Sequence, residues 1–167
     1  DSRELAPNHP HVVRIEGRPA NTELAGAISL TDLVRQSLRM RPDRLVVGEV
    51  RGAEIVDLLT AMNTGHEGGC GTVHANSTAD IPARLEALAS LGGLPRAALH
   101  AQLASALDAV IHVTRDNSGM RRVAEISIFI REPASGLVRS ECAIDFRPDG
   151  STVLGPGSRP LERMLDR

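Results

Sequence analysis

Lysine does not occur in this sequence, and all 19 of its basic residues are arginines. Tryptophan and tyrosine are absent as well, and phenylalanine occurs only twice among the 167 residues. A core without large rings has to be built from Leu, Val, Ile and Ala. The scarcity of rings also argues against a protein that binds nucleic acid by stacking bases on aromatic side chains.

The sequence also has only two cysteines, no long apolar run and a small net charge. Cys70 and Cys142 stand far apart and suggest no disulfide framework, which favours a reducing compartment. No apolar run approaches the roughly 18–20 residues of a membrane span, and no signal peptide is visible. The net charge of −2 gives no general attraction for polyanions. Because the first residue is not Met, we expect a fragment of a longer protein.

The first half of the chain predicts a strand–helix–strand unit behind an N-terminal helix. Weak alternation over residues 11–16 permits a strand. Ser29 and Asp32 form a capping-box pattern, so a helix follows, and Pro42 ends it. We then expect strands over 44–50 and 71–73. The helix between them carries one apolar face, made of Ile55, Leu58, Leu59 and Met62. Gly65 is its candidate C-terminal cap.

The second half predicts two helices and then antiparallel strands. Ser77 or Thr78 begins the first helix, and Pro95 begins the second. The tail from Arg147 is rich in Pro, Gly and Arg, and we expect it to be weakly ordered. Strands are expected over 109–115, 121–130 and 136–146. The fold class is therefore α/β, with a mostly parallel sheet flanked by helices and an antiparallel β extension.

Two candidate site residues stand at the ends of the two short strands. Glu49 follows the apolar run 45–47, and His74 follows the strand 71–73. In an α/β sheet the carboxyl ends of neighbouring parallel strands form the ligand-binding edge, so we expect both side chains on one rim. A carboxylate there can orient a water or hold Mg²⁺ through one. The alternative is a solvated acid paired with a nearby arginine.

Arginines crowd around Glu49, and guanidinium groups bind phosphate in a bidentate manner. Arg51 lies two residues past Glu49 and fits a phosphate site. Arg14 and Arg18 lie near the start of the chain and are candidates for an interface. The remaining arginines of this stretch fit a site or a solvated cationic helix end: Arg39, Arg41 and Arg44.

His66, Cys70 and His74 are spaced as H-x3-C-x3-H. Structural zinc takes four ligands, so three across a Gly-rich turn argue against a metal site. A Cys–His nucleophile pair is not favoured either, because no orienting motif accompanies it. A histidine at a strand end can instead sense phosphate by hydrogen bonding. His100 and His112 are expected to pack in a helix and a strand.

The segments LRMRPDRLVVGEVRG and AMNTGHEGGCGTVHANS together closely resemble the secretion ATPases of bacterial type II and type IV systems. The nearest resemblance is to the tight-adherence (Flp) pilus assembly ATPases. LVVGEVR resembles their atypical Walker B motif, and TGHEGGCGTVHAN resembles their histidine box. DSREL resembles the end of their Asp box, and HVVRIEGRP resembles their arginine-bearing segment. The resemblance runs from Asp1 to about Arg122.

The resemblance implies the C-terminal part of a RecA-like P-loop NTPase core over residues 1–146, followed by a tail over 147–167. It implies a homohexamer, cytoplasmic and peripheral to the inner membrane. Such a hexamer hydrolyses Mg-ATP to power pilus assembly or protein secretion, and its partners are platform proteins of the inner membrane. Direct binding of nucleic acid is not expected, because the sequence lacks a basic stripe.

The same resemblance implies roles for individual residues. Glu49 is the Walker B acid, close to Mg²⁺ and to the attacking water, and Gly48 precedes it in the nucleotide-binding motif. Arg51 supports the Walker B region. The histidines that read the γ-phosphate are His66 and His74. The candidate phosphate contacts across the subunit boundary are Arg14 and Arg18.

The sequence departs from the family pattern in three places. Gly71 stands where relatives usually carry a hydroxyl residue, and Cys70 stands where they carry an aliphatic one. No G-x-x-x-x-G-K-[ST] P-loop is present, and without lysine none can be hidden. The family places that loop upstream of Asp1. We therefore expect this chain alone to bind ATP poorly.

Two alternatives stay open at the level of sequence. One is a conjugative type IV secretion ATPase of the same family. The other is a catalytically silent fragment that only oligomerises or binds partners. The coding sequence upstream of Asp1 separates a motor from a silent module, since an in-frame P-loop supports the motor.

Overall fold

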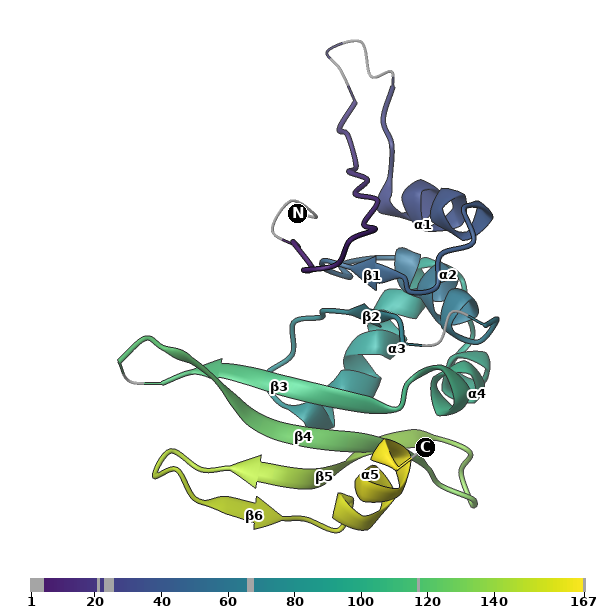
Figure 1. The fold of residues 1–167 in the computed structure, drawn as a ribbon. Helices are drawn as coiled ribbons and strands as arrows, with labels where there is room; N and C mark the ends of the chain where they lie inside the picture. Colours follow the sequence, from purple (N-terminus) through teal and green to yellow (C-terminus); the bar gives the residue numbers. More distant parts are fainter. Residues whose placement is uncertain (1–4, 21, 23–25, 66–67, 117, 167) are drawn as a thin grey trace. The chain divides into compact units, whose positions relative to one another are not determined.

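The structure is a computed structural model, and it describes residues 5–20, 22, 26–65, 68–116 and 118–166. Its elements, drawn in Figure 1, divide into two compact units. Unit 1 comprises residues 1–74 and 88–94, and unit 2 comprises residues 75–87 and 95–167. Within the described ranges, no helix has the length and apolar character needed to cross a bilayer.

Unit 1 contains a parallel strand pair joined by a helix. Its elements are α1 (Leu30–Arg39), β1 (Val46–Val47), α2 (Glu54–Met62) and β2 (Cys70–Gly71). β1 and β2 pair in parallel, with Val47 opposite Gly71. The N–H of Val50 donates to the carbonyl of Thr72 at 2.8 Å and extends the pairing past the strand ends. Because parallel strands need a crossover connection, α2 lies between them in the sequence.

Helix α1 begins and ends where the sequence predicts. The hydroxyl of Ser29 accepts the N–H of Asp32 at 3.1 Å, and the carboxylate of Asp32 accepts the N–H of Ser29 at 3.1 Å, so the capping box is formed. Directly before Pro42, Arg41 has a φ of 51°. A left-handed residue closes a helix, and the N–H of Arg41 donates to the carbonyl of Leu38 at 3.2 Å.

The core of unit 1 is aliphatic. Helix α2 buries Ile55, Leu58 and Leu59, and Val47 of β1 is buried as well. Burying one such side chain contributes roughly 1.5–3 kcal/mol. The packing therefore fixes the start of α2 and the end of β1, and these are the two elements that carry the candidate site.

Unit 2 is a four-stranded antiparallel sheet covered by helices, and its strand order is β3-β4-β5-β6. The strands are β3 (Ala109–Arg115), β4 (Arg121–Arg131), β5 (Val138–Phe146) and β6 (Thr152–Leu154). The 3₁₀ helix η2 precedes α3, whose last residues belong to unit 1. The helical elements are η2 (Thr78–Asp80), α3 (Ile81–Leu91), α4 (Arg96–Ala106) and α5 (Ser158–Leu165).

Two neighbouring residues of β4 show how the sheet of unit 2 is covered on both faces. Ser127, fully buried, donates to the hydroxyl of Thr78 in η2 at 3.2 Å. Ile128 instead packs with Leu161 of α5 and Ala143 of β5. Because successive residues of a strand point to opposite faces, η2 and α5 lie on opposite sides of the sheet.

The expected α/β class is confirmed, and it combines a parallel pair with an antiparallel sheet. Strand β3 has the predicted bounds, and β4, β5 and the helix after Pro95 form as predicted. The expected strand over 11–16 is wrong. Residues 11–16, all of which the structure describes, pair with no strand, and Val13 is 56% exposed. Arg18, beyond them, forms an isolated bridge with Ile28. Without a partner strand, weak alternation does not produce a sheet.

The strands flanking α2 are shorter than expected, because only 46–47 and 70–71 pair regularly instead of 44–50 and 71–73. The expectation of a weakly ordered tail from Arg147 is wrong, since β6 and α5 lie in it. Leu161 of α5 is 8% exposed, so the tail contributes to the core. The assignment of residues 1–146 to a single ATPase domain stays a prediction.

Candidate functional site

Glu49 lies just past the carboxyl end of β1, and only 14% of its side chain is exposed. Its Oε2 accepts a hydrogen bond from Nη2 of Arg51. Its Oε1 lies 3.0 Å from Nε2 of His74. The structure therefore brings together the carboxylate and the imidazole that the sequence placed on one rim, with Arg51 beside them.

The parallel pairing of β1 and β2 explains why these residues meet. Thr72 follows β2, and its hydroxyl donates to the carbonyl of Gly48. Its own carbonyl accepts the N–H of Val50 at 2.8 Å. These two bonds hold the segment that follows β1 against the segment that follows β2. Glu49 and His74 then extend from neighbouring backbone segments.

The side chains around Glu49 favour its ionised form. The hydrogen bond from Arg51 lowers the pKa of Glu49 below its usual value, against the opposing effect of burial, and the charge of His74 adds to the lowering. The same bond raises the pKa of Arg51. Glu49 is therefore a carboxylate at neutral pH. Such a group can accept a hydrogen bond from water and can hold Mg²⁺ through a water molecule.

One residue of this site was missed by sequence reasoning. Glu54 is the first residue of α2 and is 9% exposed. Its Oε1 accepts the N–H of Arg51 at 2.6 Å and the N–H of Gly52 at 2.8 Å. A signal was present in the sequence, because an acid in the first turn of a predicted helix can bond to free N–H groups there.

The other predicted site residues are not all brought together. Gly48 joins the cluster through its carbonyl. Arg18 donates from Nε to the carbonyl of Gly26 at 3.0 Å, and Arg14 is exposed. Within the part of the chain that the structure describes, neither arginine forms a hydrogen bond or ion pair with Glu49 or His74. His66 lies outside the described residues.

The donor set of this site suits one kind of metal binding. Among the described residues, no three His, Cys, Asp or Glu side chains form a group that could hold a metal ion. Cys70 and Cys142 are free thiols. Mg²⁺ needs no all-protein cage, since it is usually bound by one or two carboxylates together with water and substrate phosphates. The single carboxylate of Glu49 fits that chemistry.

A parallel strand–helix–strand unit with an acid at the end of its first strand is the arrangement of α/β nucleotide-binding proteins. The family described as "Type II/IV secretion system protein" matches residues 1–144 of this chain. This chain belongs to that family.

Individual curated proteins are similar in sequence to most of this chain. A Mycobacterium tuberculosis protein whose name refers to conjugal transfer is 63% identical over 128 residues, which cover 77% of this chain and 36% of the relative. The type IV secretion system protein PtlH of Bordetella pertussis is 38% identical over 136 residues, 75% of this chain and 39% of the relative. The chain thus spans somewhat more than a third of the length of these curated relatives.

A solved structure supports the fold assignment. The VirB11 ATPase from the type IV secretion system of Brucella suis, in complex with sulphate, has a TM-score of 0.56 and 28% sequence identity to this chain. The match covers 60% of this chain and 32% of that one. The chain therefore has the fold of the C-terminal part of a RecA-like core.

Proposed function

We propose that this chain is the C-terminal part of an ATPase that hydrolyses ATP to power pilus assembly or protein secretion across the bacterial inner membrane. The observation that carries the proposal is the largely buried Glu49 carboxylate, which contacts Arg51 and His74 where β1 and β2 end. The similarity to the VirB11 ATPase and the match to the secretion family support it.

In the proposed mechanism, each residue acts through the atom that the geometry makes available. The ionised Glu49 accepts a hydrogen bond from the attacking water and orients it. Nε2 of His74 lies close to a carboxylate, so it carries a hydrogen and can donate one. Its side chain is 83% exposed and is free to turn toward a phosphate oxygen. Bound Mg²⁺ supplies charge neutralisation at the phosphates.

In our proposal the P-loop, which makes most of the contacts to the phosphates, lies outside this chain. A P-loop requires a lysine, and the sequence has none. The chain alone is then expected to bind Mg-ATP weakly in a calorimetric titration. An affinity in the micromolar range would contradict the placement of the P-loop elsewhere.

The decisive test uses the full-length protein. Glu49→Gln removes the charge of the water-orienting group and keeps its size, so turnover is expected to fall by about 10²-fold or more with nucleotide affinity preserved. Asp43→Asn is the matched control, since Asp43 is an exposed acid of the same segment. Wild-type turnover in the Glu49 variant would remove this residue from the mechanism.

The assembly and the cellular role are further parts of the proposal. We place the protein in a homohexamer at the cytoplasmic face of the inner membrane, where Arg14 and Arg18 contact phosphate across the subunit boundary and platform proteins are its partners. A role in tight-adherence (Flp) pilus assembly is the first candidate, on the motifs of the sequence. Loss of pili on deletion of the gene tests it.

Conjugation is the second candidate, and the names of two relatives refer to it. The Mycobacterium tuberculosis relative and the TrbB relative of Sinorhizobium fredii, which is 36% identical over 99 residues, both have names that refer to conjugal transfer. A deletion that abolishes plasmid transfer and leaves pili intact would select this candidate. A parent gene that lacks a P-loop would instead select a silent interaction module.

A further inference from the structure

The contact between Arg51 and Glu49 depends on a long, exposed side chain. The side chain of Arg51 is 68% exposed, so packing does not hold it in place. An exposed arginine loses side-chain entropy when it is fixed in one geometry, which makes surface ion pairs weak. A defined orientation of the guanidinium at Glu49 therefore needs a backbone that is itself held.

Glu54 provides that restraint. Its carboxylate accepts the N–H groups of Arg51 and Gly52, at 2.6 and 2.8 Å, from the first turn of α2. Helix α2 is anchored by Ile55 and Leu58, which are both 3% exposed. The position of the Glu54 carboxylate is thus set by the core of unit 1. Hydrogen bonds to a charged acceptor are among the stronger ones in proteins.

The bonds of Glu54 hold the segment before the helix as well as the start of the helix, as the bond from Asp32 back to Ser29 does at α1. A helix cap bonds to the N–H groups of the first helical turn. The N-cap residue of α2 is Ala53, which makes no side-chain cap hydrogen bond. Glu54 reaches back to two residues that precede α2. Replacing Glu54 therefore releases the segment that carries Arg51 together with the start of α2.

Gly52 leaves the space that this arrangement requires. A Cβ atom added to Gly52 would lie 3.0 Å from Oε2 of Glu54. That distance is tighter than an ordinary contact, so a side chain here shifts the carboxylate by a few tenths of an ångström. Residues 51–54 therefore depend on one another. The absence of a side chain at Gly52 leaves room for the Glu54 carboxylate, and this carboxylate holds the backbone of Arg51 and Gly52.

We infer that Glu54 is a positioning residue that fixes the backbone at Arg51 and Gly52, so that the Arg51 guanidinium holds the Glu49 carboxylate in one orientation. The restraint on the backbone is independent of ATP. Its use in hydrolysis rests on the proposed function.

The experiment compares four variants of the full-length protein: Glu54→Ala, Glu54→Gln, Gly52→Ala and Asp57→Ala. Asp57→Ala is the matched control, because it removes another acid from the first turn of α2. Asp57 pairs with Arg35 at 2.9 Å instead of bonding to this segment. Circular dichroism establishes that each variant is folded.

The first measurement needs no nucleotide. Amide hydrogen exchange of Arg51 and Gly52, followed by NMR, is expected to accelerate at least about tenfold in Glu54→Ala, as for the loss of a hydrogen bond to a charged group. Glu54→Gln keeps a carbonyl oxygen that accepts both N–H groups, so a smaller effect is expected. Asp57→Ala is expected to leave both amides unchanged. Unchanged exchange in folded Glu54→Ala would overturn the inference.

The second measurement separates kcat from nucleotide affinity. In Glu54→Ala, kcat is expected to fall at least about tenfold, with the Kd for Mg-ATP within about twofold of the wild type, because the change misplaces a reacting group and leaves the binding surface alone. Glu54→Gln is expected to restore part of kcat. An unchanged kcat in Glu54→Ala, or an equal loss in Asp57→Ala, would overturn the inference.

Two further outcomes are decisive as well. If Glu54→Ala does not fold, Gly52→Ala is used in its place, because the added methyl group shifts the Glu54 carboxylate without removing that group. The same outcomes for amide exchange and for kcat then support or overturn the inference. If the wild-type full-length protein hydrolyses no ATP, the proposed function fails. The amide exchange then still supports or overturns the backbone restraint by itself.

Discussion

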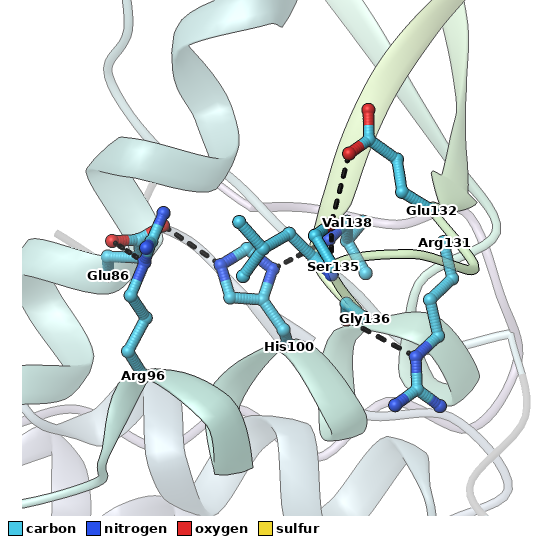
Figure 2. A network of polar contacts seen from close by, with 9 residues as sticks. Glu86, Arg96, His100, Arg131, Glu132, Ser135, Gly136 and Val138 are labelled. Atoms are coloured by element: carbon cyan, nitrogen blue, oxygen red, sulfur yellow. Dashed lines mark hydrogen bonds and ion pairs between the residues drawn. The ribbon is translucent and has the colours of Figure 1, made fainter.

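The imidazole Nδ1 of His100 accepts the backbone N–H of Val138 at 2.8 Å (Figure 2). His100 is 2% exposed, so this bond lies in the interior of unit 2. Because Nδ1 accepts a hydrogen, the ring carries its hydrogen on Nε2, which lies 2.9 Å from Oε1 of Glu86. The second oxygen of Glu86 accepts Nε of Arg96 at 2.9 Å. One ring thus joins α3, α4 and β5.

Replacing His100 with leucine is expected to destabilise unit 2 by about 1–3 kcal/mol, because it leaves the buried N–H of Val138 without an acceptor. Denaturant unfolding of both proteins gives this difference. His112→Leu is the control, since His112 is a partly buried histidine of β3 whose side chain forms no hydrogen bond within the described part of the chain. Equal stability of the two variants would show that the bond to Val138 contributes nothing.

Glu86 predicts a dependence of stability on pH. The hydrogen bond to His100 lowers the pKa of Glu86 below its usual value, and Arg96 lowers it further against the effect of burial. A lowered folded pKa stabilises the protein above the unfolded pKa of about 4.3, and this contribution is lost as the pH falls below it toward the folded pKa.

Unfolding free energies measured between neutral pH and acid are expected to fall less steeply below about pH 4.3 in Glu86→Gln than in the wild type. Glu162→Gln provides the control, since Glu162 is an exposed acid of α5. Parallel curves for the wild type and the Glu86 variant would contradict the assignment.

Local patterns in the sequence were sufficient to place the starts of α1 and α4. The capping box at Ser29 marks a helix start through local hydrogen bonds between side chains and backbone N–H groups. The proline before α4 marks another through its restricted φ. Neither signal depends on the rest of the fold. The proximity of Glu49 and His74 also followed from the sequence, because parallel strands bring their carboxyl ends to one edge.

Helical periodicity and composition did not reveal two other features of the structure. Glu54 forms its bonds to the segment before its own helix, which helical periodicity does not report. The composition after Arg147 suggested disorder, because Pro and Gly are common in loops. In the structure Gly155 and Gly157 instead allow the backbone to approach β5 closely. Composition alone does not separate a flexible glycine from one selected for a close approach.

Gly155 supports a prediction about this approach. A Cβ atom at Gly155 would lie 2.3 Å from the carbonyl oxygen of Cys142, which is well inside van der Waals contact. Gly155→Ala is therefore expected to cost roughly 1–3 kcal/mol, as overpacking does. It is also expected to increase hydrogen exchange in α5. Pro156→Ala, a change at the next position of the same connection, is the control, with a loss of at most about 1 kcal/mol.

Two leucines of α5 provide a matched test of whether this helix belongs to the core. Leu161 is 8% exposed and packs with Ile128 and Ala143, whereas Leu165 is 78% exposed. Both changes to alanine alter helix propensity in the same way, so their difference isolates burial. Leu161→Ala is expected to cost about 2–5 kcal/mol in denaturant unfolding, and Leu165→Ala less than about 0.5 kcal/mol. Equal losses in the two variants would mean that α5 does not pack on the sheet in solution.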